Sequence, residues 1–257
     1  MKIILSLSVF LASFSFAQEF TKAIEDNSFF IEEAYNQEDH VVQHIINAAR
    51  SQTKHFLETS VTQEWPAFGQ LHQLSFTLPM QFDQSITPSQ QGIGDVMINY
   101  RYQWINENDL AVSPRISLIV PAGNESKGFG NGVFGAQINL PISKRFSNEI
   151  VTHYNAGVTV LPNVQFTTSK AAITEYFVGA SGIYLANKSF NVMAEVLYTS
   201  SGSTFGRTDE LIICPGVRWA IDIGELQIVP GLAFPFYFTS GNNDNGVFLY
   251  LSFEHPY

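Results

Sequence analysis

The chain has 257 residues and a formal net charge of −10, with 13 basic and 23 acidic side chains. This acidic balance argues against a nucleic-acid partner, because phosphate backbones require a basic surface. The single cysteine, Cys214, excludes an intramolecular disulfide and is interpreted as a packing residue. A mean hydropathy of +0.05 is expected for elements that face lipid on one side and water on the other.

The N-terminus has the features of a secretory signal. Lys2 precedes an apolar run over residues 3–16, and Ser15 and Ala17 are the small residues of a cleavage site after position 17. A retained anchor is the alternative, but a run of about fourteen residues is short for a spanning helix. No cysteine follows the cleavage site, which argues against a lipoprotein, and no later segment has the apolar length of a transmembrane helix. The predicted signal peptide is residues 1–17.

Residues 18–39 form an acidic lead-in that also contains apolar Phe29, Phe30 and Ile31. We expect this segment to lie at the periplasmic mouth of the following domain or to plug it partly, with disorder as the alternative. Residues 40–257 are the predicted barrel domain.

Strands in this domain alternate polar with apolar residues. In the run 95–104, DVMINYRYQW, one face carries Asp95, Asn99 and Arg101, and the other carries Val96 and Tyr100. A period of two, repeated over segments of about ten residues, predicts a transmembrane antiparallel β-barrel with a polar interior. About twelve strands are expected, at 40–50, 55–67, 70–83, 93–105, 109–121, 132–144, 148–161, 172–186, 189–201, 208–221, 225–238 and 246–255.

The predicted connectors alternate in length, as expected for short periplasmic turns and longer external loops. The long ones are rich in Gly, Ser and Asn and cover 83–92, 122–131, 162–171, 200–208 and 239–245. The connector at 51–54 breaks the rule because it should be external but is short. Aromatic residues cluster near the short turns, as a membrane-interface girdle requires: Trp65, Trp104, Phe146, Tyr184, Phe190 and Trp219.

The last strand, GVFLYLSF, resembles the C-terminal assembly signal of outer-membrane barrels, so the barrel-assembly machinery is an expected partner. Four further residues follow the strand's terminal aromatic, Phe253, which makes the match partial.

Strand parity divides the side chains between lipid and lumen. Charge at mid-bilayer on the lipid side costs about 2–4 kcal/mol for Arg or Lys, so charged positions are assigned to the lumen. They form either a charge-filtering constriction or an ion-pair network that fills a narrow barrel. The lumen-lining candidates are Glu58, Glu64, Asp95, Arg101, Arg115, His153, Glu175, Glu195 and Arg218.

Three motifs resemble a known family. They are Gly92-Ile93-Gly94-Asp95, the run 114–123 (PRISLIVPAG) and Leu140-Pro141-Ile142-Ser143-Lys144. Together they resemble an outer-membrane barrel family associated with the meta pathway of phenol degradation, often labelled transporters. The strand rhythm extends the resemblance over most of the mature chain. The resemblance implies uptake of small molecules, including hydrophobic or aromatic compounds. It does not imply any catalytic residue in this chain.

An enzymatic function is the least favoured interpretation. His153 and Asn155 share one strand face, but a lipid-modifying hydrolase would need an accessible serine beside the histidine and a site open to lipid. The sequence contains no GxSxG elbow, and the histidines lack metal-ligand spacing. No catalytic residue, cofactor or metal is therefore assigned.

The sequence as a whole predicts a barrel in the outer membrane of a Gram-negative cell, in contact with lipid and with small-molecule solutes. The predicted function is a channel or transporter-like barrel. The alternatives are a non-conducting structural or surface barrel and a lipid-modifying enzyme.

Overall fold

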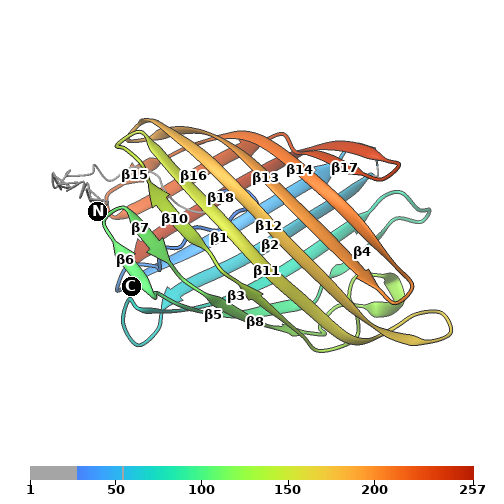
Figure 1. The fold of residues 1–257 in the computed structure, drawn as a ribbon. Coiled ribbons are helices and arrows are strands. Elements are labelled where there is room, and N and C mark those ends of the chain that lie inside the picture. The colour runs from blue at the N-terminus through green and yellow to red at the C-terminus, as the bar shows by residue number, and fades with distance from the viewer. Residues whose placement is uncertain (1–27, 54) are drawn as a thin grey trace, which may run out of the picture.

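The computed structural model describes residues 28–53 and 55–257, which form a closed antiparallel barrel of twelve strands (Figure 1). The predicted all-β class and strand number are confirmed. The barrel closes where β1 (Val41–Ser51) pairs with β18 (Asn243–Pro256) on one side and with β2 (Phe56–Pro66) on the other. The predicted signal peptide and the acidic segment up to residue 27 lie outside the described residues.

Some wall strands are continuous and others are interrupted. Besides β1, β2 and β18, the continuous strands are β3 (His72–Asp83), β11 (Ile150–Gln165), β12 (Lys170–Asn187) and β13 (Phe190–Ser203). Each interrupted wall strand consists of two or three segments. The first consists of β4 (Gln90–Ile93), β5 (Val96–Tyr102) and β6 (Ile105–Glu107). The others are β7 (Leu110–Val112) with β8 (Arg115–Val120), β9 (Gly135–Asn139) with β10 (Ile142–Arg145), β14 (Gly206–Trp219) with β15 (Ile221–Ile223), and β16 (Leu226–Ala233) with β17 (Phe236–Thr239).

Proline accounts for three of these interruptions. Pro114 lies between β7 and β8, Pro141 between β9 and β10, and Pro235 between β16 and β17. Proline has no N–H to donate to the neighbouring strand, so regular pairing stops at each position. The wall nevertheless resumes in the same direction, and each predicted strand corresponds to one wall strand.

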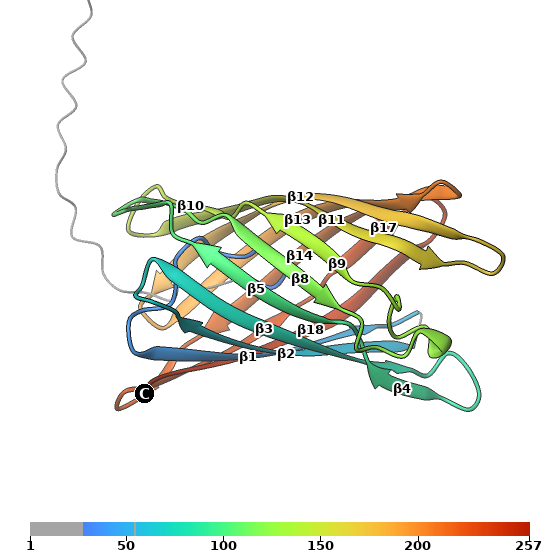
Figure 2. The same ribbon diagram turned by 90° about the horizontal axis from the view of Figure 1, so that it is seen from below.

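The two ends of the barrel differ. Tight turns, such as 108–109, 188–189 and 224–225, gather at the end that holds the C-terminus (Figure 1). The loops 84–89 and 121–134 lie at the opposite end, where the short helix η1 (Glu125–Lys127) lies beside β4 (Figure 2).

Three of the predicted external loops contain more strand than expected. The strands continue to residues 165, 203 and 239 and resume at 170, 206 and 243. In the β13–β14 hairpin, for example, Gly202 pairs with Arg207 and Ser203 with Gly206. Cross-strand hydrogen bonds satisfy the backbone there, so pairing overrides the weak strand preference of Gly and Ser.

The outer surface is an apolar belt. Along β8, Ile116 is 55% exposed and Leu118 is 47% exposed, whereas Ser117 between them is 2% exposed and faces inward. This alternation agrees with the predicted parity. Large aromatic side chains near the tight turns are exposed as well: Phe68, Trp104, Phe146, Tyr184 and Trp219. No helix in the described ranges is long and apolar enough to cross a membrane.

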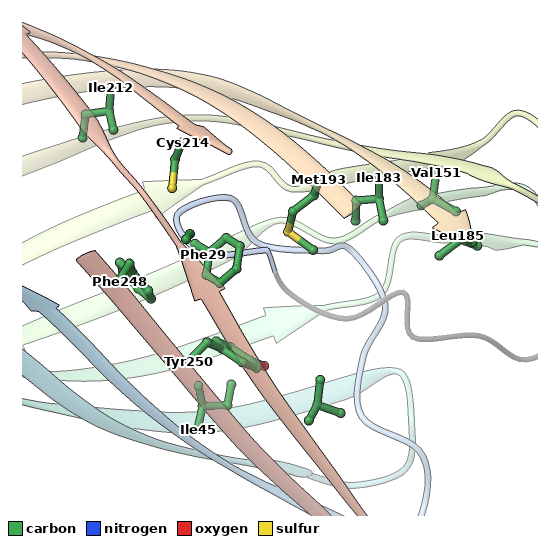
Figure 3. Packing of buried hydrophobic residues seen from close by; sticks show 12 residues of the cluster. Phe29, Ile45, Val151, Ile183, Leu185, Met193, Ile212, Cys214, Phe248 and Tyr250 are labelled. Carbon is green, nitrogen blue, oxygen red and sulfur yellow. The ribbon is translucent and has the colours of Figure 1, made fainter. Parts of the chain in front are cut away.

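The inner surface has an apolar side and a polar side. The apolar cluster is centred on the inner face of β11–β18 and includes Ile183, Met193, Cys214, Phe248 and Tyr250 (Figure 3). The inner face of β3, β5 and β8 instead carries buried polar residues, among them Gln73, Ser75, Asn99, Arg101 and Ser117.

Candidate functional site in the barrel lumen

Residues 28–37 lie inside the barrel, where wall side chains bind their main-chain groups. The Glu195 carboxylate on β13 accepts the backbone N–H of Phe29 at 2.6 Å and that of Phe30 at 2.8 Å. Glu195, which parity assigned to the lumen, is 3% exposed and anchors the start of this described segment.

Two wall amides hold the middle of the segment through paired bonds. Asn155 accepts the N–H of Glu32 at 2.9 Å and donates to its carbonyl oxygen at 2.8 Å. Gln103 accepts the N–H of Asn36 and donates to the carbonyl oxygen of Ala34, both at 2.8 Å. Each amide thus satisfies one donor and one acceptor of the segment, as a neighbouring strand would do.

The predicted lumen residue His153 lies beneath the same segment. Its Nδ1 is 2.7 Å from the Ser143 hydroxyl oxygen, which also accepts the Ala34 N–H at 2.7 Å. Ser143, His153 and Ala34 are all 0% exposed. The serine–histidine pair is therefore covered and binds the segment, which does not match the accessible pair that a hydrolase needs.

Arg101 also binds main-chain oxygens of the segment, and it interacts electrostatically with Glu64. It donates to the carbonyl oxygens of Glu33, at 3.0 Å, and of Tyr35, and to the side-chain oxygen of Asn36 at 2.9 Å. A further bond to Gln73 measures 3.0 Å. The guanidinium is 3% exposed, so most of its donors are used to hold the segment.

Arg115 lies directly across from Arg101 on the adjacent strand and makes an ion pair with Glu32 of the segment at 2.9 Å. Two wall acceptors, Asn99 at 2.7 Å and Gln137 at 2.6 Å, orient the same guanidinium. The positive charge of two neighbouring arginines is thus offset by an acidic residue that comes from the segment itself.

The Arg115–Glu32 ion pair lies between two polar cavities, each of about 180 Å³. Phe30, Glu32 and Arg115 line both of them. The first cavity is also lined by Ser28, Phe29, Ile31, Ile45, Asn47, Thr62, Glu64, Gln73, Ser75, Thr77, Asn99, Arg101 and Tyr250, and the second by Gln137, Asn139, Asn155, Glu175, Phe177, Leu197 and Thr199.

Three buried polar atoms of residues that line these cavities have no protein hydrogen-bond partner among the described residues: Asn47 Oδ1, Arg115 Nε and Asn139 Oδ1. Buried polar atoms are usually paired.

The remaining charged candidates have separate surroundings. Arg218 is fully buried, lies over the Tyr250 ring at 5.2 Å and interacts electrostatically with Glu195. Glu64 accepts from Gln73 at 2.8 Å, and Glu175 lines the second cavity. Glu58 is exposed in the external half of β2.

Asp95 binds an external loop. Its carboxylate accepts the N–H of Gly123 at 3.1 Å and of Asn131 at 2.8 Å, which ties together the two sides of the loop that carries η1. No cluster of three or more His, Cys, Asp or Glu that could hold a metal occurs within residues 28–53 and 55–257.

Sequence reasoning missed Gln73 and Ser143 as lumen residues. Parity offered a signal for Gln73, because it alternates with the apolar Leu74 on the same strand. Parity offered the same signal for Ser143, which alternates with apolar Ile142, but its contact with Ala34 depends on the distant segment that packs over it. A search for charged positions overlooks such neutral side chains.

No family model and no curated protein matches this chain. Solved structures do. An outer-membrane channel from Pseudomonas putida F1 has a TM-score of 0.64 at 11% identity, covering 87% of this chain and 98% of that one. The NanC porin has a TM-score of 0.61 at 11% identity, covering 82% and 98%, and the KdgM porin reaches 0.53 at 9%, covering 84% and 99%.

The chain has the fold of an outer-membrane porin. The predicted outer-membrane location is confirmed by the closed barrel, its apolar belt and these structural relatives. The porin-like barrel thus contacts membrane lipid through its outer face, and its lumen holds the segment and the two cavities.

Proposed function

We propose that this porin-like barrel is an outer-membrane channel for small polar solutes. The observation that carries the proposal is the pair of polar cavities on either side of the Arg115–Glu32 ion pair. Hydrogen-bonding side chains line both cavities, so a polar solute in the lumen can form hydrogen bonds at each of them.

The cavity lining favours polar solutes over hydrocarbons. Hydroxyl, amide and charged side chains predominate in the first cavity, although Phe29, Ile31 and Ile45 also line it. The family resemblance suggested hydrophobic or aromatic compounds. We favour solutes that form hydrogen bonds, since a hydrocarbon would leave the polar lining unsatisfied.

Single-channel conductance in planar bilayers tests the proposal. The wild type is expected to conduct, and Arg115→Ala is expected to shift ion selectivity toward cations, because one positive charge is lost and Glu32 is left unpaired. The matched control is Ile116→Ala, whose side chain faces lipid and should leave selectivity unchanged. Silent bilayers over a range of voltage and salt would overturn the proposal.

A non-conducting structural barrel is the second candidate. It is favoured by the number of hydrogen bonds that hold residues 28–37 across the lumen. If this candidate is correct, neither the wild type nor a variant with a loosened segment conducts.

We also propose that the barrel-assembly machinery recognises β18. Val247, Leu249 and Leu251 alternate with the buried Phe248 and Tyr250, so the strand presents an apolar outer face. Insertion assays with this strand altered at Phe253 would test the assignment.

A further inference from the structure

We propose that the inner wall of the barrel is a binding site for an extended peptide. Residues 28–37 occupy the site in this chain, and a free oligopeptide of matching pattern can occupy it in their place. The proposal is independent of conduction, because a peptide can bind to an open or a closed barrel.

The wall recognises peptide backbone rather than one particular sequence. Glu195 binds two consecutive N–H groups, and Asn155 and Gln103 each bind one N–H and one carbonyl group. Every peptide offers these groups. In peptide recognition by added strands, main-chain bonds supply affinity and side-chain pockets supply specificity.

The first side-chain pocket holds Phe29 and is shaped by two glycines. A Cβ on Gly216 would lie 2.3 Å from the Phe29 ring, and one on Gly231 would lie 3.1 Å from it. Phe248 and Tyr250 pack edge-on against the ring, with centroid distances of 5.5 and 6.3 Å (Figure 3). Only residues without a side chain leave room for an aromatic ring at this part of the wall.

Two more positions are selective. A Cβ on Gly179 would lie 2.4 Å from the Ile31 side chain, and Ala34 is 0% exposed beside Ser143. The wall therefore accepts an aromatic residue, a branched aliphatic residue two positions later and a small residue three positions after that. The matching ligand class is an oligopeptide with this spacing.

The test uses the full chain, folded and then cut. A protease recognition sequence is inserted between Glu38 and Asp39, and the barrel is cleaved only after it has folded. Fluorescently labelled synthetic peptide 28–37, added in excess, is expected to exchange into the cut barrel and raise the anisotropy. The uncut chain is the control and should not bind, because its own segment competes at an effective concentration of about millimolar.

Two altered peptides test how the ligand is recognised. N-methylation at Glu32 and Ala34 removes two bound N–H groups and is expected to weaken binding roughly tenfold or more. A peptide with Phe29→Ala should also bind more weakly. The proposal is overturned if the labelled peptide does not enter the cut barrel, or if the N-methylated peptide binds as well as the parent.

A second measurement needs no cut. In the uncut chain, Gly216→Ala is expected to expel the Phe29 ring and to speed hydrogen exchange at the Phe29 and Phe30 amides. Gly182→Ala is the matched control, since a Cβ there meets no atom within 4 Å. Equal exchange in both variants would contradict the assignment of Phe29 as the anchor.

Discussion

Glu195 shows how one lumen side chain can acquire a role that its charge alone does not reveal. A buried carboxylate costs free energy unless charges or hydrogen bonds compensate it. Glu195 has both, from the N–H groups of Phe29 and Phe30 and from the electrostatic interaction with Arg218. The same hydrogen bonds therefore offset the free-energy cost of burying the Glu195 carboxylate and fix the position of the segment.

Glu195→Gln should therefore loosen the segment. The amide keeps one acceptor but turns an N–H donor toward a peptide N–H, so docking should weaken by about 1–3 kcal/mol, the usual cost of a buried donor left unsatisfied. Faster cleavage of the folded barrel by a glutamate-specific protease at Glu32 and Glu33 would report this loosening. Glu175→Gln, which alters a lumen carboxylate that lines only the second cavity, is the control. Equal cleavage rates would show that Glu195 does not hold the segment.

At the scale of elements, Asp95 links a strand to a loop. The carboxylate follows β4 and accepts N–H groups from both sides of the loop 121–134. Gly130 permits this approach, because a Cβ there would lie 2.6 Å from Asp95 Oδ1. The sequence motif at positions 92–95 therefore has a local structural explanation.

Asp95→Ala is expected to release this loop while the barrel stays closed. Two N–H groups lose their acceptor, which costs about 1–3 kcal/mol for each one that stays buried. Trypsin cleavage at Lys127, followed by mass spectrometry, should become faster. Asp83→Ala, at the end of β3 before the neighbouring loop 84–89, is the control because the Asp83 carboxylate accepts hydrogen bonds from Ser85 in that turn. Unchanged cleavage at Lys127 would refute the role of Asp95.

At the scale of the whole molecule, the barrel separates a lipid-facing surface from a water-accessible interior. Ile116 is 55% exposed on the outside, whereas Thr62 lines the first cavity. The single native cysteine, Cys214, is fully buried. Introduced cysteines can therefore report the two faces separately.

In intact membranes, a small water-soluble thiol reagent is expected to label Thr62→Cys and to leave Ile116→Cys unlabelled. A lipid-soluble reagent should give the opposite result. Labelling of position 116 alone by the water-soluble reagent would mean that the two faces are inverted, and every lumen residue named above would then face lipid.

The strand pattern alone was sufficient to predict the closed barrel and its twelve strands, and it assigned Arg101, Glu195 and Arg218 to the lumen. Alternation with a period of two is a local property of each strand, so neighbouring residues decide the strand pattern. Charge is too costly to place in lipid, so neighbouring residues also decide which face of a strand points inward. The external hairpins were harder to predict, because strand pairing extended Gly- and Ser-rich stretches that read as loops.

The path of residues 28–37 through the lumen was decided only by the tertiary structure. Phe29 and Glu195 are 166 positions apart, and Ala34 and Ser143 are 109 apart. An acidic, partly apolar segment suits a periplasmic mouth, a plug or disorder equally well, since its composition does not reveal which distant groups will meet it. Closure of the barrel places Glu195, Asn155, Gln103 and Arg101 around the same lumen. Only in that arrangement can these four side chains bind successive main-chain groups of the segment.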